Sequence, residues 1–191
     1  MNATASPAVV TKPSLWKIDP AHTAAHFSVR HLMISNVRGE FTKVSGGAFI
    51  DPSDPAKSSV EVTIDAASLN TREPQRDEHL RSADFFHVAN HPTLTFRSKR
   101  IEALSPEEHK VTGDLTIRGN TKDVTFDVEG PTPAVKDPYG NIRVGITATA
   151  KISRKEFGLV WNALTETGGV MVGDEVKITI EAELIQQAPA A

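Results

Sequence analysis

Residues 176–184 read VKITIEAEL, an unbroken alternation of apolar and polar side chains. Successive side chains of a β-strand point to opposite faces of the sheet, so this stretch presents one apolar face and one polar face. Residues 60–64 and 124–128 repeat the same period of two. The three stretches therefore predict strands with one face in a core and the other face in water.

Turn-forming residues separate these strands from six weaker alternating stretches. The weaker stretches are residues 15–19, 24–33, 37–50, 93–104, 110–118 and 142–153. The turns include DPSDP at 51–55, RGNT at 118–121 and DPYGN at 137–141, where proline fixes φ and glycine or asparagine tolerates positive φ. About eight strands joined by such turns predict an all-β domain, either an antiparallel β-barrel or a two-layer sandwich.

The periodicity leaves open whether the core is filled or hollow. Some strands offer bulky inward residues such as Phe96 and Phe126, whereas others offer only Gly47, Gly113 or Ala148. Small inward residues leave space unless large neighbours fill it, and aromatic residues make up only 6% of the chain. Because a barrel of eight strands can hold either side chains or one small ligand, a packed core and a cavity both fit the sequence.

Residues 68–91 interrupt the strand pattern. Pro74 suits the first turn of a helix, and residues 75–82 contain no glycine, proline or β-branched residue. We therefore expect a short helical insertion, followed by the apolar pair Phe85-Phe86. In an all-β chain, such an insertion is expected to plug or border one end of the barrel.

The composition is typical of a single globular domain. Of the 191 residues, 39% are hydrophobic and 24% are charged, and the net charge of -3 does not suggest a nucleic-acid-binding protein. Cysteine is absent, which excludes disulfides and thiolate ligands. No apolar run approaches the roughly 20 residues of a transmembrane helix.

The predicted barrel domain spans residues 15–186. Residues 1–14 are expected to be a flexible segment and residues 187–191 a frayed tail. The first segment has no basic region and no apolar stretch of about 7–15 residues, so it does not resemble a signal peptide. This favours a cytoplasmic protein, or a periplasmic one if a signal had been removed.

Three histidines near the first long strand, His22, His26 and His31, raise the possibility of a metal site. Four residues of a strand span about 13 Å, which is too far for one ion, and His26 and His31 should face opposite sides. We therefore expect no metal site. His31 shares a face with Phe27 and Val29, and it is either a core histidine or a polar contact to a ligand head group.

Arg76 and Arg81 lie in the densest polar cluster, residues 76–82. Asp77 and Arg81 are four residues apart on the expected helix and could form an ion pair. The two guanidinium groups could instead bind a phosphate or a carboxylate, because their geometry matches both. The sequence has no nucleophile elbow, P-loop or dinucleotide-binding fingerprint, so we predict no catalytic residue and no cofactor.

Nine motifs, in this order along the chain, resemble those of the YceI-like family of polyisoprenoid-binding, lipocalin-like proteins. They are WKID at 16–19, HTAAHFSVRHL at 22–32, VRGEF at 37–41, RDEHLRSADFF at 76–86, HPTLTF at 91–96, GDLTIRG at 113–119, DPYG at 137–140, SRKEFG at 153–158 and VGDEV at 172–176. The resemblance extends over about residues 16–185. It implies an extended antiparallel β-barrel that holds an isoprenoid or other long-chain lipid, often as a homodimer.

From this resemblance we expect non-catalytic binding, sequestration or transport of a lipid such as an isoprenoid quinone, a polyprenyl phosphate or a fatty amide. Two alternatives remain: an enzyme acting on a bound lipid, and a packed-barrel stress or interaction protein without a ligand. The expected apolar wall or gate consists of Phe27, Val29, Phe85, Phe86, Phe96 and Trp161. The expected head-group contacts are His31, Arg76 and Arg81.

Overall fold

The computed structural model describes residue 10 and residues 12–164 and 169–188. Within these residues, twelve strands form one antiparallel sheet. The strands are β1 (Ser14–Ile18), β2 (Ala24–His31), β3 (Ser35–Phe41), β4 (Val44–Ile50), β5 (Ser59–Asp65), β6 (Leu69–Asn70), β7 (Thr93–Ala103), β8 (Glu108–Ile117), β9 (Asn120–Glu129), β10 (Val135–Lys136), β11 (Ile142–Ser153) and β12 (Val172–Gln186). The helix α1 spans Pro74–Arg81, and 3-10 turns span Pro20–His22 (η1), Pro55–Lys57 (η2), Ala66–Ser68 (η3) and Arg154–Phe157 (η4).

Eight of the strands close into a barrel. Their order around the ring is β11-β9-β8-β7-β5-β4-β1-β12, and the pairing of β12 with β11 closes it. The predicted all-β antiparallel barrel with a short helix is therefore confirmed, and the alternative of a two-layer sandwich is wrong. The short strands β10 and β6 lie at the two ends of the sheet, outside the closed ring.

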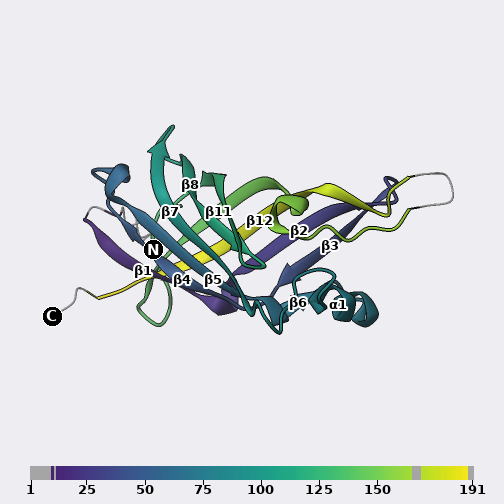
Figure 1. The fold of residues 1–191 in the computed structure, drawn as a ribbon. Helices are drawn as coiled ribbons and strands as arrows, with labels where there is room; N and C mark the ends of the chain where they lie inside the picture. Colours follow the sequence, from purple (N-terminus) through teal and green to yellow (C-terminus); the bar gives the residue numbers. More distant parts are fainter. Residues whose placement is uncertain (1–9, 11, 165–168, 189–191) are drawn as a thin grey trace.

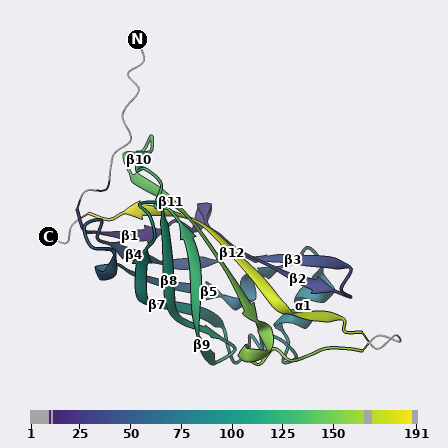
Figure 2. The same cartoon turned by 90° about the horizontal axis from the view of Figure 1, so that it is seen from above.

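β12 is long enough to pair with two strands, one after the other, along the same edge. Residues 184–186 pair with β1, and residues 172–181 pair with β2. On the other edge, residues 175–185 pair with β11. Because β2 continues past the ring, the β2–β3 hairpin and the start of β12 reach beyond the barrel, with α1 at their base (Figures 1 and 2). We call this extension, together with residues 158–164 alongside it, the arm.

The stretch 37–50, predicted as one strand, is two strands. The backbone between β3 and β4 is held by η3, since Thr42 N donates to the carbonyl of Ser68 (3.3 Å) and Lys43 N donates to Ser68 Oγ (3.1 Å). β3 therefore pairs with β2 in the arm, whereas β4 pairs with β1 and β5 in the barrel.

α1 lies where the sequence predicts a helix, with Pro74 in its first turn. The ion pair considered between Asp77 and Arg81 is not formed. Asp77 Oδ1 accepts from Thr71 N (2.8 Å) and Thr71 Oγ1 (2.5 Å), while Arg81 donates to the carbonyl of Leu69. The chain before α1 runs against the helix and offers these closer partners, which fix α1 over the arm end of the barrel.

The buried side chains of the barrel form one hydrophobic cluster, which includes Trp16 and Leu184 near the chain ends. The predicted flexible segment 1–14 and frayed tail 187–191 fall mostly on residues outside those described, so both stay predictions. Among the described residues, no helix has the length and apolar character needed to cross a membrane.

Candidate ligand-binding cavity

The barrel encloses a cavity of about 230 Å³. Inward side chains of ten strands line it, all except β6 and β10, and Leu80, Phe85 and Phe86 border it beside α1. The insertion therefore borders one end of the barrel, as the sequence predicts. The lining extends from the arm to the far end of the barrel, because Val172 and Leu184 at the two ends of β12 both belong to it.

The cavity exists because small side chains lie opposite large ones. Ala48 on β4 and Ala182 on β12 leave space, and they lie four strands around the ring from Phe126 on β9 and Phe96 on β7, respectively. The two aromatic rings pack edge to face at 5.1 Å. The wall is aliphatic and aromatic except for three residues with polar side chains, which are His26, Thr95 and Arg154. An apolar wall favours apolar molecules over water, so the arrangement suits a hydrocarbon chain.

Five of the residues predicted as apolar wall lie in the lining: Phe27, Val29, Phe85, Phe86 and Phe96. The sequence reasoning missed Phe41, which links two of them. Its ring lies 5.8 Å from that of Phe27 and packs edge to face on Phe86 at 5.5 Å. The VRGEF motif that ends at Phe41 was the available signal. Contact of these residues with a ligand stays a prediction.

Trp161 and His31 lie outside the lining. The Trp161 ring packs behind the wall, 5.3 Å from the ring of Phe85 and 4.8 Å from that of His79. His31 is half-buried at the end of β2, opposite Ser35. Their predicted roles as gate and head-group contact are therefore not supported by direct exposure to the cavity.

Arg76 and Arg81 also lie away from the cavity wall. Arg76 donates through Nε to Thr71 Oγ1 (2.8 Å) and through Nη2 to the carbonyl of Thr71 (2.9 Å). Arg81 donates through Nε to the carbonyl of Ala67 (3.1 Å). Both guanidinium groups thus hold the preceding chain against α1, and their head-group roles stay predictions without support from this placement.

Arg154, in the SRKEFG motif, is the charged residue of the lining that the sequence reasoning missed. It is 4% exposed and lies in η4, at the arm end of the cavity. Burial lowers the pKa of its guanidinium group below the ordinary value. It remains a cation at neutral pH, because an arginine side chain does not lose its proton in proteins.

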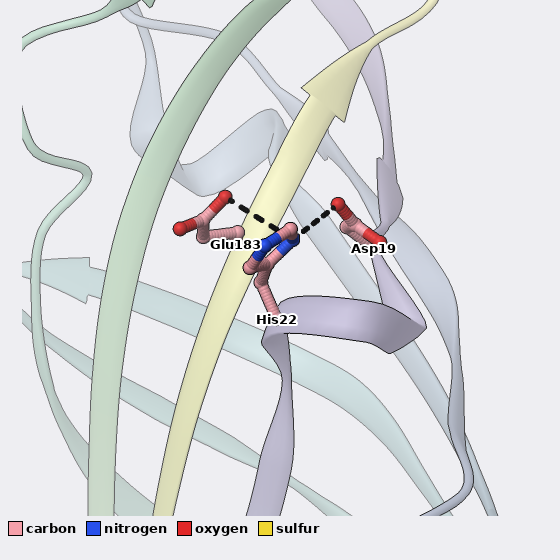
Figure 3. Close-up of side chains that lie close together, drawn as sticks. All are labelled: Asp19, His22 and Glu183. Carbon is pink, nitrogen blue, oxygen red and sulfur yellow. Dashed lines mark hydrogen bonds and ion pairs between the residues drawn. The ribbon is translucent and has the colours of Figure 1, made fainter.

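A second cluster of polar residues lies on the outer face of the barrel, at the break between β1 and β2. His22 Nδ1 lies 2.9 Å from Asp19 Oδ2 and 3.9 Å from Glu183 Oε2, so these three side chains could hold a metal ion (Figure 3). The guanidinium of Arg143 already contacts both carboxylates, at 2.5 Å from Asp19 and 3.1 Å from Glu183. A cation among the donor atoms opposes a metal ion, so the geometry favours an ion-pair network.

Comparison with known proteins places the chain in a family. The YceI-like domain profile matches residues 16–184. UPF0312 proteins of Staphylococcus aureus strains bovine RF122 / ET3-1 and N315 are each 38% identical over 165 residues, covering 86% of this chain and 94% of the relative.

Solved structures show the same fold. Burkholderia cenocepacia BcnA superposes with a TM-score of 0.74 at 25% identity, covering 87% of this chain and 98% of BcnA. The Campylobacter jejuni YceI protein gives a TM-score of 0.71 at 34% identity, covering 83% and 90% of the two chains. A polyisoprenoid binding domain from Saccharophagus degradans, at 15% identity and a TM-score of 0.65, shares the fold over 90% of this chain and 98% of its own. The chain therefore belongs to the YceI-like family.

Proposed function

We propose that this protein binds a long-chain isoprenoid or a similar amphiphilic lipid inside its barrel and keeps it out of water. The observation that carries the proposal is the apolar cavity of about 230 Å³, whose lining runs from Val172 to Leu184. Family membership supports it, because polyisoprenoid binding is what the resemblance implies.

Burial of the lipid tail supplies the driving force. Each buried methylene contributes about 0.8 kcal/mol, so a five-carbon isoprene unit contributes roughly 4 kcal/mol before ordering and association costs. Net affinities saturate near about -18 to -21 kcal/mol, so a few units already suffice for tight binding. Polar groups are then needed to orient and select the lipid.

We propose that the protein performs no chemistry on its ligand and stores or carries it, with isoprenoid quinones among the candidates. Within the described part of the chain, the cavity lining contains no carboxylate, and its polar members are His26, Thr95 and Arg154. An acid–base or nucleophilic mechanism needs such groups within hydrogen-bond reach of each other. An enzyme would convert an added isoprenoid, whereas a carrier returns it unchanged on extraction.

Native mass spectrometry of the purified protein, followed by organic extraction, tests the proposal directly. We expect a bound lipid, or uptake of an added polyprenyl lipid by delipidated protein, with stoichiometric recovery of the intact molecule. Protein that is empty and stays empty with polyprenyl lipids present would overturn lipid binding. Recovery of a chemically altered lipid would favour the enzyme instead.

We further propose that the chain forms a homodimer through the arm. Leu32, Met33 and Ile34 at the hairpin tip are exposed, as are Leu164 and Val170 beside them. The two segments are joined, since Leu32 N donates to the carbonyl of Met171 (2.8 Å) and Leu164 bridges to Val170. A contiguous exposed apolar patch is typical of an interaction surface.

Sedimentation of the wild-type protein should give a dimer, and Ile34→Asp should dissociate it. Tyr139→Asp changes an exposed residue far from the arm and should leave the dimer intact. A monomeric wild type would contradict the dimer.

A further inference from the structure

Arg154 is a buried cation whose backbone partners leave one donor unused. Its Nε donates to the carbonyl of Gly173 (2.8 Å), its Nη1 to those of Leu159 and Trp161, and its Nη2 to that of Val172 (3.2 Å). A guanidinium has five N–H groups. One Nη2 N–H therefore has no partner among the residues that the structure describes.

The charge of Arg154 is offset only at longer range, by the carboxylate of Asp174. Within the described chain, no carboxylate forms an ion pair with it inside 4.0 Å. The nearby Asp174 instead accepts from Ser153 Oγ (2.8 Å) and from Lys155 N (3.2 Å). Neutral carbonyls satisfy the N–H groups of a cation but leave its charge, and a buried charge without a direct ion-pair partner is costly.

The charges at the opposite end of the barrel would repel an anion. The β8–β9 hairpin runs along the barrel, and its turn lies beside η4, since Asn120 Nδ2 donates to the carbonyl of Phe157 (3.0 Å). The open end of the same hairpin pairs Glu108 with Glu129. Both line an outer groove together with three further glutamates, Glu107, Glu181 and Glu183. Arg143 pairs with Glu183, but the other four glutamates form no ion pair with a described residue, so an anionic group is favoured at the arm end over this one.

We propose that Arg154 is a head-group site, which binds an anionic oxygen of the lipid, in a phosphate or a carboxylate, at the arm end of the cavity. This inference rests on the proposed lipid binding. The anion would take the unused N–H and neutralise the guanidinium charge. The tail would extend from Val172 towards Leu184, a length of about 40 Å at roughly 3.3 Å per strand residue.

The test compares lipids that share a tail and differ in the head group. Delipidated protein is titrated with farnesol and farnesyl phosphate, and separately with hexadecanol and palmitate. Charge-assisted hydrogen bonds to a buried cation predict that wild type binds at least one of the two anions about tenfold or more tightly than its alcohol. If phosphate alone is preferred, the head group is a prenyl phosphate; if palmitate alone is preferred, it is a fatty acid.

Arg154→Met should bring the ratio of the two dissociation constants close to one, while farnesol affinity changes little. Arg154→Lys should keep part of the preference, because it keeps the charge. Arg118→Met is the matched control: Arg118 also donates to two backbone carbonyls at this end, those of Gly158 and Ala83, but it does not line the cavity. Arg118→Met should lower the free energy of unfolding without changing the ratio of the dissociation constants for the alcohol and the anion.

Two wild-type measurements keep the inference testable if Arg154→Met does not fold. Equal binding of each anion and its alcohol by wild type, in both the farnesyl pair and the C16 pair, would overturn the head-group site and leave lipid binding intact. Failure of all four lipids to bind would overturn the proposed function instead. A crystal structure with palmitate should place its carboxylate beside Arg154, and a carboxylate at the glutamate end would contradict the assignment.

Discussion

Arg143, which contacts three carboxylates, lies outside the cavity lining. It donates through Nε to Asp137 Oδ2 (2.8 Å), and its Nη1 contacts the carboxylates of Asp19 and Glu183. Hydrogen bonds from Arg143 hold the pKa values of Asp19 and Asp137 well below the ordinary value of 3.8. Arg143 is on β11. Its three partners come from the residue before η1 (Asp19), from the loop that precedes β11 (Asp137) and from β12 (Glu183), which pairs with β11.

These lowered pKa values make a prediction about acid stability. A carboxyl group whose pKa is lowered on folding stabilises the protein above its unfolded pKa and loses that contribution as the pH falls through the folded value. Arg143→Met should therefore lower Tm at pH 7, and the difference from wild type should shrink below about pH 4. Thermal unfolding between about pH 2 and pH 7, a range that spans the unfolded carboxyl pKa of about 4, measures this difference.

Arg97→Met provides the control for Arg143. It removes an ion pair with Glu61 in which both side chains are largely exposed, and such pairs contribute little. Its Tm should stay near that of wild type at every pH. An Arg143→Met difference that is constant with pH would mean that the network acts through packing and not through charge.

At the residue scale, the sequence predicts apolar positions better than polar ones. Alternation alone places Phe27 and Val29 on one face, and both line the cavity. The arginines of the helix were equally plausible head-group contacts by residue type. Their guanidinium groups meet backbone carbonyls of residues 67–71, whereas Arg154 reaches the cavity. Which arginine faces the ligand depends on how η4 packs against β12, and no local pattern records that contact.

At the scale of the element, Gly39 in β3 allows the ring of Phe27 to lie across the neighbouring strand. A Cβ at this position would overlap Phe27 Cζ and would lie 2.8 Å from Thr71 Cγ2. Gly39 is opposite Phe27 in the β2–β3 pairing. The absence of a side chain therefore sets the position of an aromatic ring in the cavity wall.

Gly39→Ala should destabilise the fold by about 1–3 kcal/mol, because the added methyl forces Phe27 or Thr71 to move. Combining it with Phe27→Leu should recover part of this loss, and a double-mutant cycle by urea unfolding measures the coupling. Gly145→Ala is the control, since its Cβ would meet Thr132 Cγ2 at an ordinary 3.4 Å. Additive losses from Gly39→Ala and Phe27→Leu would contradict the proposed contact.

Single elements are predicted well where their signals are local. Pro74 and the helix-forming residues after it locate α1, and the alternation of residues 176–184 locates β12. The division of residues 37–50 into β3 and β4 was not predictable, because it depends on hydrogen bonds to Ser68. The division of one edge of β12 between β1 and β2 is likewise a long-range pairing.

At the scale of the whole molecule, the hollow barrel follows from how large and small inward residues combine around the ring. The sequence showed both kinds and left a filled core and a cavity equally open. The outcome depends on which of them face each other across the closed barrel, such as Phe96 on β7 and Ala182 on β12, which are four strands apart around the ring. Only closure of the ring determines these neighbours.

Filling this space should separate lipid binding from folding. Ala148 on β11 lines the cavity, whereas Thr149 next to it faces the other side of the strand. Ala148→Phe should lower affinity for long polyprenyl chains by about tenfold or more, because a ring occupies volume that the tail needs. The delipidated variant should be no less stable than wild type, since burial of the added ring fills a void whose presence is unfavourable.

Chain length makes the test specific. A short prenyl alcohol should bind Ala148→Phe almost as well as wild type, so the ratio of long-chain to short-chain affinity reports the loss of cavity length. Thr149→Phe, which adds the same ring on the outer face, should leave this ratio unchanged.

Wild type should also gain about 2.7 kcal/mol of unfolding free energy at a free lipid concentration of 100 Kd, whereas Ala148→Phe should gain less at the same concentration. Equal stabilisation of both proteins by a long polyprenyl lipid would mean that the lipid binds outside the barrel.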